Sequence, residues 1–488
     1  MNDEHGLSGV VDPGGFVAER FGVRLHTDQE ASVVPVGRLV GLALRKNPRR
    51  AHLLVSTVLA KHVPTDPATT IAAGALLGVL VAELLAAEGG VPRLPSARAR
   101  AFGDRLTEVL EGRGRADGLR ALLVDARVSD PALSVIGYAE TATGLGRIVA
   151  DTLGAAYIHS TRLDVPGSRS FAGFEEEHSH ATSHRLLPRR SDWFRAGGTV
   201  VLVDDEVSTG STIINTIRSL HAVVPQRRWV VAALIDLRSG VDRARFDALA
   251  AELGAAIDVV ALGTGSIDLP SGLLDEAQRF FADTADAVVP DAHVSAPGAV
   301  SLVDLRAHPP VPLDRFGTLA DERPDLLAGS ETARALAAAV AAEAAVPRRD
   351  PQDHDSPPRV LVLGTEEAIA LPLAVADALR EATTAEVVFS TTTRSPIHPL
   401  DRGDYAIQTA VRFDRHDRVL DDEPRRYAYN LTRGGERFDE IVLVPEPGTP
   451  EDALTGPGSV TEALAGVASR VTVILLTAPL APSESSRA

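Results

Sequence analysis

The 488-residue chain contains no cysteine. That absence excludes disulfide bonds, thiolate nucleophiles, iron–sulfur clusters and cysteine-ligated zinc. It is consistent with a reducing compartment. The first residues also show no basic segment followed by an apolar one, so no signal peptide is predicted. We therefore expect a soluble, cytoplasmic protein.

Lysine is nearly absent, because only Lys46 and Lys61 occur among the 49 basic residues. Neither follows a glycine-rich loop, which excludes a Walker A site. Acidic residues number 66, and the net charge is -17. A chain this acidic is a poor partner for nucleic acid or for an anionic membrane, and we expect neither. Any phosphate ligand must be bound by a local site.

No apolar run is long enough to span a membrane comfortably. The longest uncharged stretch, Pro67–Ala82, is closed by Glu83 and is predicted to form a buried helix. Gly74 and Gly78 within it predict close packing against a neighbouring element.

Buried apolar strands alternate with helical segments along most of the chain, a pattern typical of a parallel α/β sheet. Strands are predicted at 133–137, 155–160, 199–203, 229–235 and 257–262, and again at 359–364, 385–390, 440–444 and 470–476. The predicted division is a first domain at 30–300, a helical segment and linker at 301–358, and a second α/β domain at 359–480.

The two units share several features. The second predicted strand of each ends in hydroxyl residues closed by an arginine, at 160–162 and 391–394. A later strand in each runs into an acidic loop, VLVDDEVSTG in the first unit and VLVPEPGTP in the second. One interpretation is an internal duplication with a degenerate second copy. The alternative is that all parallel α/β units share this rhythm.

The most informative segment is VVLVDDEVSTGST, at 200–212. A hydrophobic strand ends in Asp204 and Asp205, and a hydroxyl- and glycine-rich loop leads into a helix. The free N–H groups of a helix N-terminus favour an anion such as phosphate. The two acids instead suit ribose hydroxyls or Mg²⁺. Together they predict a site for a sugar phosphate, whereas the alternative is an ordinary N-cap after a strand.

This segment resembles the phosphoribosyl pyrophosphate (PRPP) motif of type I phosphoribosyltransferases, whose fold is a Rossmann-like parallel sheet. The resemblance implies that Asp204 and Asp205 contact the ribose hydroxyls and hold Mg²⁺. It also implies that the 5′-phosphate is bound by Ser208, Thr209, Gly210, Ser211 and Thr212. In the second unit Glu446 replaces the acidic pair and no Thr-Gly loop follows, so that domain is not expected to bind PRPP.

Upstream residues extend the resemblance. The loop that holds pyrophosphate in such enzymes corresponds here to Glu140, Thr141, Ala142, Thr143 and Gly144. Lys61 is the better candidate for a basic residue of an N-terminal hood, whereas the segment 45–50 also suits a solvated turn. A dinucleotide fingerprint is disfavoured, because Val149 occupies its third glycine position.

The polar stretch 161–191 takes the place of the mobile catalytic loop of this family. It offers Arg162 and Arg169 but no lysine. It also contains FEEEHSHATSH, in which His178 and His180 are candidate proton donors, metal ligands or base contacts. The alternative is a solvated polar loop.

The segment STTTRSPIHPLD narrows the resemblance to phosphoribosyltransferases with a C-terminal TRSP domain, found in tellurite-resistance-associated bacterial operons. It covers about residues 30–480. It implies Mg²⁺-dependent transfer from PRPP to a nucleobase-like acceptor with release of pyrophosphate, in the synthesis of a nucleoside-like metabolite. It also implies a homodimer and partner proteins from the same operon.

Two questions stay open at this level. Arg394, Ser395 and Asp401 could bind a second ligand or part of the substrate. Alternatively, Arg394 could pair with Asp401 or Asp404 to fix the loop. The whole chain could also be a non-catalytic PRPP sensor or a scaffold of a complex.

Overall fold

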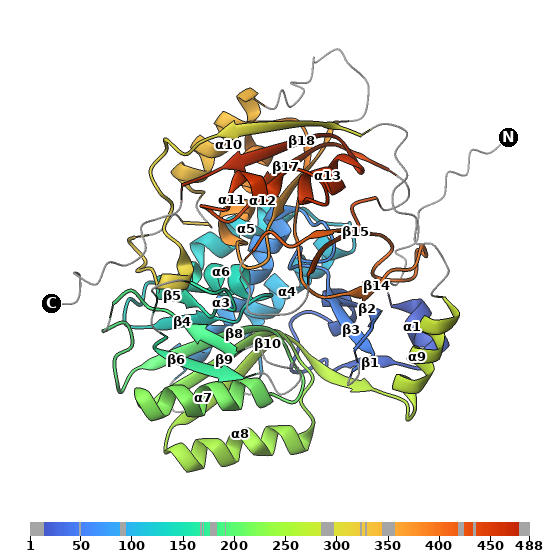
Figure 1. Cartoon of the computed structure of the whole chain (residues 1–488). Helices are drawn as coiled ribbons and strands as arrows, with labels where there is room; N and C mark the ends of the chain where they lie inside the picture. Colours follow the sequence, from blue (N-terminus) through green and yellow to red (C-terminus); the bar gives the residue numbers. More distant parts are fainter. Residues whose placement is uncertain are drawn as a thin grey trace.

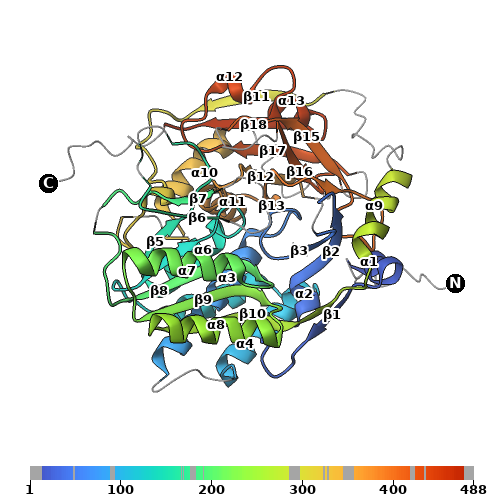
Figure 2. The ribbon, with the colours of Figure 1, turned by 60° about the horizontal axis from the view of Figure 1, so that its bottom comes forward.

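A computed structural model of the chain shows an α/β protein built from two parallel-sheet domains (Figure 1). The structure describes residues 14–47, 50–87, 94–165, 168, 170–175, 183–190, 192–284, 297–322, 325–326, 329–343, 357–417, 424–432 and 436–477. The second domain, orange to red, lies above the first in both Figure 1 and Figure 2.

The first domain is organised around a sheet of order β1-β10-β9-β8-β4-β5. Its strands are β1 (Arg24–Thr27), β4 (Ser134–Gly137), β5 (Ala156–His159), β8 (Thr199–Val207), β9 (Arg228–Asp236) and β10 (Ala256–Asp268). All are parallel except β1, which pairs antiparallel with β10 at the edge. The five parallel strands were all predicted, to within a few residues except at the carboxyl ends of β8 and β10.

Helices cover both faces of this sheet, and Figure 1 shows α7 and α8 on the face away from the second domain. The helices of this domain are α1 (Gly15–Phe21), α2 (Val36–Leu39), α3 (Pro67–Ala86), α4 (Ala97–Leu110), α5 (Ala116–Asp125), α6 (Thr143–Leu153), α7 (Ser211–Val223), α8 (Gly240–Leu253) and α9 (Leu273–Asp283).

Helix α3 confirms the predicted buried helix. By length and composition it is apolar enough to cross a membrane, but 83% of its apolar window is buried inside the protein. A core helix of a soluble protein has the same properties. A Cβ on Gly74 would lie 2.9 Å from Ile148 Cβ, and one on Gly78 would lie 2.6 Å from Thr152 Cβ. The two glycines therefore let α3 approach α6 closely, as predicted.

The second domain contains a fully parallel sheet of order β11-β18-β17-β12-β13. Its strands are β11 (Ala299–Asp304), β12 (Arg359–Gly364), β13 (Glu386–Thr391), β17 (Phe438–Val444) and β18 (Ala468–Leu475). Its helical elements are η1 (Asp314–Phe316), α10 (Glu331–Glu343), α11 (Ala370–Ala382), α12 (Glu451–Leu454) and α13 (Val460–Ala465). Strand β11 crosses the expected boundary between residues 300 and 301 and pairs with β18, so the first residues of the expected helical segment and linker belong to this sheet.

Three small antiparallel sheets complete the fold. They contain β2 (Val40–Arg45), β3 (His52–Ser56) and β14 (Ile397–His398); β6 (Ala172–Glu175) and β7 (Ser183–Leu186); and β15 (Ala410–Asp414) and β16 (Arg425–Tyr429). The first of these joins the domains, because β14 of the second domain adds to the β2–β3 hairpin of the first. The hydrophobic core is also continuous across the two domains.

The two sheets share one strand order. Positions β9-β8-β4-β5 correspond to β18-β17-β12-β13, and the neighbouring fifth position is filled by β10 in one domain and by β11 in the other. The loops agree in detail: Ser160 N–H donates to the Gly137 carbonyl at 2.9 Å, and Thr392 N–H donates to the Gly364 carbonyl at 3.0 Å. This is the arrangement that an internal duplication predicts, although β11 precedes its domain in the chain whereas β10 ends its own.

The glycines of α3 provide a test of the close packing. Gly78→Ala gains helix propensity of about 1 kcal/mol but must displace Thr152, at a cost of about 1–3 kcal/mol. We expect a net loss of stability, measured as a lower melting temperature by circular dichroism.

The matched control is Gly118→Ala in α5, where an added Cβ meets nothing within 4 Å. It should keep or raise the melting temperature, because only the propensity gain applies. Equal melting temperatures for the two variants would contradict the packing explanation.

Candidate functional site

Three adjacent acids stand at the carboxyl end of β8, where ligands bind in open parallel sheets. Asp204, Asp205 and Glu206 are all half-buried. Asp204 Oδ1 accepts a hydrogen bond from the Asp205 N–H at 3.0 Å. Burial raises the pKa of Asp205, and the neighbouring Glu206 carboxylate raises it further. The ionised form of Asp205 is therefore costly in the folded protein and would be relieved by a cation.

Glu206 also belongs to the site, although it was not predicted from the sequence. Arg50 lies in the connection between β2 and β3, the two strands of the N-terminal hood. Its guanidinium is 2.6 Å from the Glu206 carboxylate. Arg50 Nε also donates to His52 Nε2 at 3.0 Å. Burial and the nearby arginines lower the pKa of His52 to about 3, so the ring is neutral and can accept this bond. Arg50 thus belongs to the site, whereas only a solvated turn or a loose match was expected for its segment.

The loop after β8 forms the start of α7, as the motif predicts. Gly210 has φ +72°, and a Cβ there would lie 2.4 Å from the Phe246 ring, so only glycine fits. Thr209 Oγ1 donates to Ser211 Oγ at 3.2 Å. Ser208, Thr209 and Thr212 are half-buried rather than enclosed. Arg245 of α8 lies beside the loop and donates to Ser211 Oγ at 3.0 Å, which adds a positive charge next to a phosphate-binding geometry.

The second loop, 140–144, lies between β4 and α6. Because β4 pairs with β8, this loop and the three acids share one edge of the sheet. Thr141 is half-buried, and the other members of the loop are buried. Lys61 Nζ donates to Thr141 Oγ1 at 3.0 Å and lies 3.1 Å from the Glu140 carboxylate. The structure therefore places one of the two lysines of the chain against this loop.

Part of the loop faces the other domain instead of an open site. Thr143 is 2% exposed, and its hydroxyl donates to the Glu367 carbonyl of the second domain at 3.0 Å. A Cβ on Gly144 would lie 2.4 Å from Ile369. In this arrangement the Thr143 hydroxyl takes part in the packing of the two domains, and its contact with pyrophosphate stays a prediction.

Arg162 follows β5 at the same edge. Its guanidinium lies 2.9 Å from His184 Nε2, and the backbone N–H of Arg162 donates to the Glu367 carboxylate at 2.7 Å. His184 is fully buried and lies 2.9 Å from Ser160 Oγ. His184 is thus a histidine of the polar stretch whose contacts the structure describes. His178, His180 and Arg169 lie outside the described residues.

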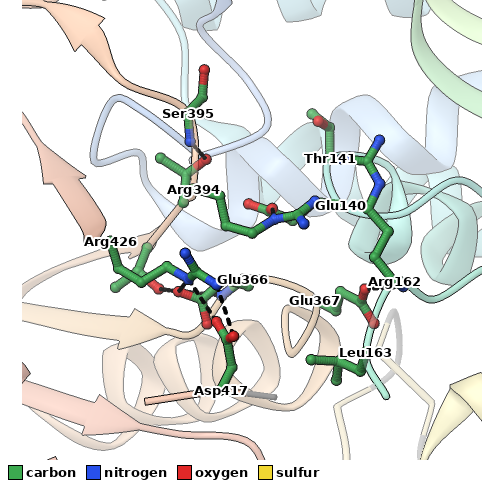
Figure 3. Close-up of polar contacts among 12 residues, drawn as sticks. Glu140, Thr141, Arg162, Leu163, Glu366, Glu367, Arg394, Ser395, Asp417 and Arg426 are labelled. Carbon is green, nitrogen blue, oxygen red and sulfur yellow. Dashed lines mark hydrogen bonds and ion pairs between the residues drawn. The ribbon is translucent and has the colours of Figure 1, made fainter. Parts of the chain in front are cut away.

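The second domain contributes Arg394 to this edge. Its Nε donates to the Glu140 carboxylate at 2.8 Å, and Figure 3 shows the two side chains meeting across the domain junction. Of the two acids considered as partners that fix the loop, Asp404 pairs with Arg402, and Asp401 is exposed. Ser395 N–H donates to Thr393 Oγ1 within its own loop at 3.3 Å.

Glu140 is held by both domains. Burial alone would raise the pKa of Glu140. The positive charges of Lys61 and Arg394 outweigh this effect and hold the pKa well below its usual range. At the carboxyl end of β9, the Arg238 guanidinium donates two hydrogen bonds to the Asp236 carboxylate, each at 2.9 Å.

The donors present suit Mg²⁺. Among the residues that the structure describes, no group of three or more acidic or histidine side chains is arranged to hold a metal ion. Mg²⁺ is commonly bound by one or two carboxylates together with substrate phosphates and water. Asp204 and Asp205, next to a phosphate-binding loop, match that pattern, and the raised pKa of Asp205 favours a cation there.

Two family models match the chain. Residues 39–266 match "Phosphoribosyl transferase", and residues 314–464 match "TRSP domain C terminus to PRTase_2". Among curated proteins no match is found.

Solved structures with a similar fold include adenine phosphoribosyltransferases. One, from Trypanosoma brucei, is a complex with AMP, pyrophosphate and ribose-5-phosphate; it is 16% identical over 36% of this chain and 72% of that chain, with TM-score 0.23. Another, from Leishmania tarentolae, is 16% identical over 40% of this chain and 83% of that chain, with TM-score 0.22.

The crowded acids predict a pH-dependent effect of Asp205→Asn. At pH 7 the wild-type carboxylate is ionised against burial and against Glu206, so the amide should raise the melting temperature, by about 2 °C, without ligand or Mg²⁺. The difference should shrink as the pH falls through the raised pKa of Asp205, because Asp205 then becomes protonated in the wild type as well.

Thermal melts of both proteins across this range provide the measurement. A lower melting temperature for the variant at pH 7, or a gain that does not change with pH, would contradict the assigned environment of Asp205.

Proposed function

We propose that the chain, in which residues 39–266 match the phosphoribosyl transferase model and residues 314–464 match the TRSP domain model, transfers the phosphoribosyl group of PRPP to a nucleobase-like acceptor, with Mg²⁺ as cofactor. The observation that carries the proposal is the meeting of two loops at one sheet edge. The acids and phosphate loop after β8 lie beside the loop after β4, which Lys61 contacts.

These groups fit the parts of PRPP in order. The N-terminus of α7, with the hydroxyls of Ser208, Thr209 and Thr212, suits the 5′-phosphate. The carboxylates of Asp204 and Asp205 suit the ribose hydroxyls. The remaining end, the diphosphate, then falls near Thr141 and Lys61, where positive charge is available.

The chemistry required is electrostatic and positional. The bond between C1 of the ribose and the pyrophosphate oxygen breaks, and a nitrogen of the acceptor forms the new bond to C1. The transition state is electron-poor at the ribose and electron-rich at the leaving pyrophosphate. Asp204 and Asp205 face the first, whereas Lys61 faces the second, and fixed charges of this kind lower the barrier. Bound Mg²⁺ would supply further neutralisation of the pyrophosphate charge.

The acceptor is proposed by chemical class only. A planar nitrogen heterocycle fits a reaction in which a ring nitrogen attacks C1, and the product is then a nucleoside-like metabolite. The resemblance of the TRSP segment to proteins of tellurite-resistance-associated operons supports a role beside other proteins of such operons.

Phosphorus NMR of the purified full chain with PRPP and Mg²⁺ tests the proposal. We expect free pyrophosphate to accumulate when a small-molecule extract of bacterial cells is added as the source of acceptor. Asp204→Asn and Asp205→Asn together should reduce the rate at least about a hundredfold, because the reacting sugar loses two contacts.

The matched control is Glu252→Gln, which removes an exposed carboxylate paired with Arg218 on the outer helices. It should keep the wild-type rate. PRPP binding without pyrophosphate release would instead identify a sensor, and no binding at all would contradict the proposal.

A further inference from the structure

The two domains exchange side chains in a reciprocal way at their junction. Glu140 of the first domain binds Arg394 of the second, at 2.8 Å. In return, Glu367 of the second domain accepts hydrogen bonds from the Arg162 N–H at 2.7 Å and from Thr161 Oγ1 at 2.6 Å. Figure 3 shows Glu140 beside Arg394, and Glu367 beside Arg162, at this junction.

The residues of this exchange occupy equivalent positions in the two sheets. Glu140 and Glu367 are each the third residue after the glycine that ends the first strand, Gly137 or Gly364. The loops that follow are bonded alike: Ala139 N–H donates to Ser160 Oγ at 2.9 Å, whereas Glu366 N–H donates to Thr392 Oγ1 at 3.2 Å.

The arginines also correspond. The residue before each arginine forms an isolated antiparallel bridge to a hairpin, Thr161 to Arg185 of β7 and Thr393 to Tyr427 of β16. Arg162 and Arg394 therefore take the same place in their domains. Arg394 contacts the glutamate of the other domain through its guanidinium, whereas Arg162 contacts Glu367 through its backbone N–H and places its guanidinium against His184.

The charge around the two glutamates differs. Glu446 takes the position of Asp205 at the end of the equivalent strand, and it pairs with Arg315, which also lies 3.9 Å from Glu367. In the second domain, the carboxylates of Glu446 and Glu367 are therefore both close to the positive charge of Arg315. A hydroxyl and glycine loop of the kind found at 208–212 does not follow Glu446.

Around Glu140, in contrast, positive charge is in excess. Lys61 Nζ lies 3.1 Å from the Glu140 carboxylate, Arg394 Nε donates to it at 2.8 Å, and the charges of both residues and of Arg162 lower the pKa of Glu140. Because β4 pairs with β8, the loop of Glu140 and the acids of β8 share one edge of the sheet. The side chains of Lys61, Glu140 and Arg394 are at most 10% exposed.

We propose that Arg394 of the TRSP domain is a ligand-binding residue of the first domain's site, where it and Lys61 bind the diphosphate of PRPP. The site is then composite, and the second domain serves the first as the donor of a fixed guanidinium. Glu140 is a positioning residue that holds both cations toward Thr141 while no ligand is bound. This inference rests on the proposed function and adds the residue that recognises the diphosphate end.

Calorimetric titration of the full chain with two probes, in the presence of Mg²⁺, tests the inference. Arg394→Ala should weaken pyrophosphate binding at least about tenfold, since a charge-assisted bond to phosphate is lost. Binding of ribose 5-phosphate should not change, because that ligand lacks the diphosphate. Arg394→Lys, which keeps the charge but loses the planar fork, should give an intermediate loss for pyrophosphate alone.

The matched control is Arg120→Ala. Arg120 also forms a buried ion pair across the domains, at 2.6 Å from Asp377, but it lies between α5 and α11 and away from the sheet edge. This variant should lower the melting temperature and leave both affinities at the wild-type values.

The outcomes separate the claims. If Arg394→Ala binds pyrophosphate as the wild type does, or if both ligands are weakened equally, the inference is overturned while the proposed function stands. If Arg394→Ala does not fold, Arg394→Lys decides: a loss confined to pyrophosphate supports the inference, and wild-type affinity for both ligands overturns it. A wild-type chain that binds neither PRPP nor pyrophosphate contradicts the proposed function itself.

Discussion

The buried carboxylate of Glu140 ties the parts of this molecule together. An ionised carboxylate with little exposure costs several kcal/mol unless it is paired, so its partners must be present whenever the protein is folded. Those partners are Lys61, which precedes α3 and follows the β2–β3 hood, and Arg394, which comes from the second domain. One buried charge therefore fixes the relative position of the hood, the loop after β4 and the TRSP segment.

The same pairing solves an electrostatic problem. The chain has a net charge of -17, and three acids stand at the end of β8, so its overall field repels a polyphosphate. Positive charge is instead concentrated around the neighbouring loop at 140–144, where Lys61 and Arg394 contact Glu140 and Arg162 follows the adjacent strand β5. An asymmetric ligand such as PRPP fits this separation, because its diol faces the acids and its diphosphate faces the cations.

Local features of the chain were predictable from the sequence. The strands β4, β8 and β12, the buried helix α3 and the loop at 208–212 depend on short stretches whose residues are neighbours in the chain. The contacts that complete the site were not predictable. Arg394 and Glu140 are 254 residues apart, and Arg50 and Glu206 are 156 apart. Which partners meet depends on how the domains and the hood pack.

Other contacts between distant segments were not predictable for the same reason. The type and spacing of Thr143 suit phosphate, but only the packing of α6 against the second domain shows that its hydroxyl donates to the Glu367 carbonyl. Strand β11 was missed because its pairing partner, β18, is at the far end of the domain in sequence. The β2–β3 hairpin was likewise expected only as two apolar segments around a basic loop.

The central claim concerns the number of PRPP sites in the chain. We propose one site, in the first domain, because the second domain has Glu446 and Arg315 where the first has the acids of β8 and a phosphate loop. Calorimetric titration of the wild-type full chain with PRPP and Mg²⁺ measures this number. We expect one PRPP bound per chain. Two equivalent sites per chain, or no binding, would contradict the account.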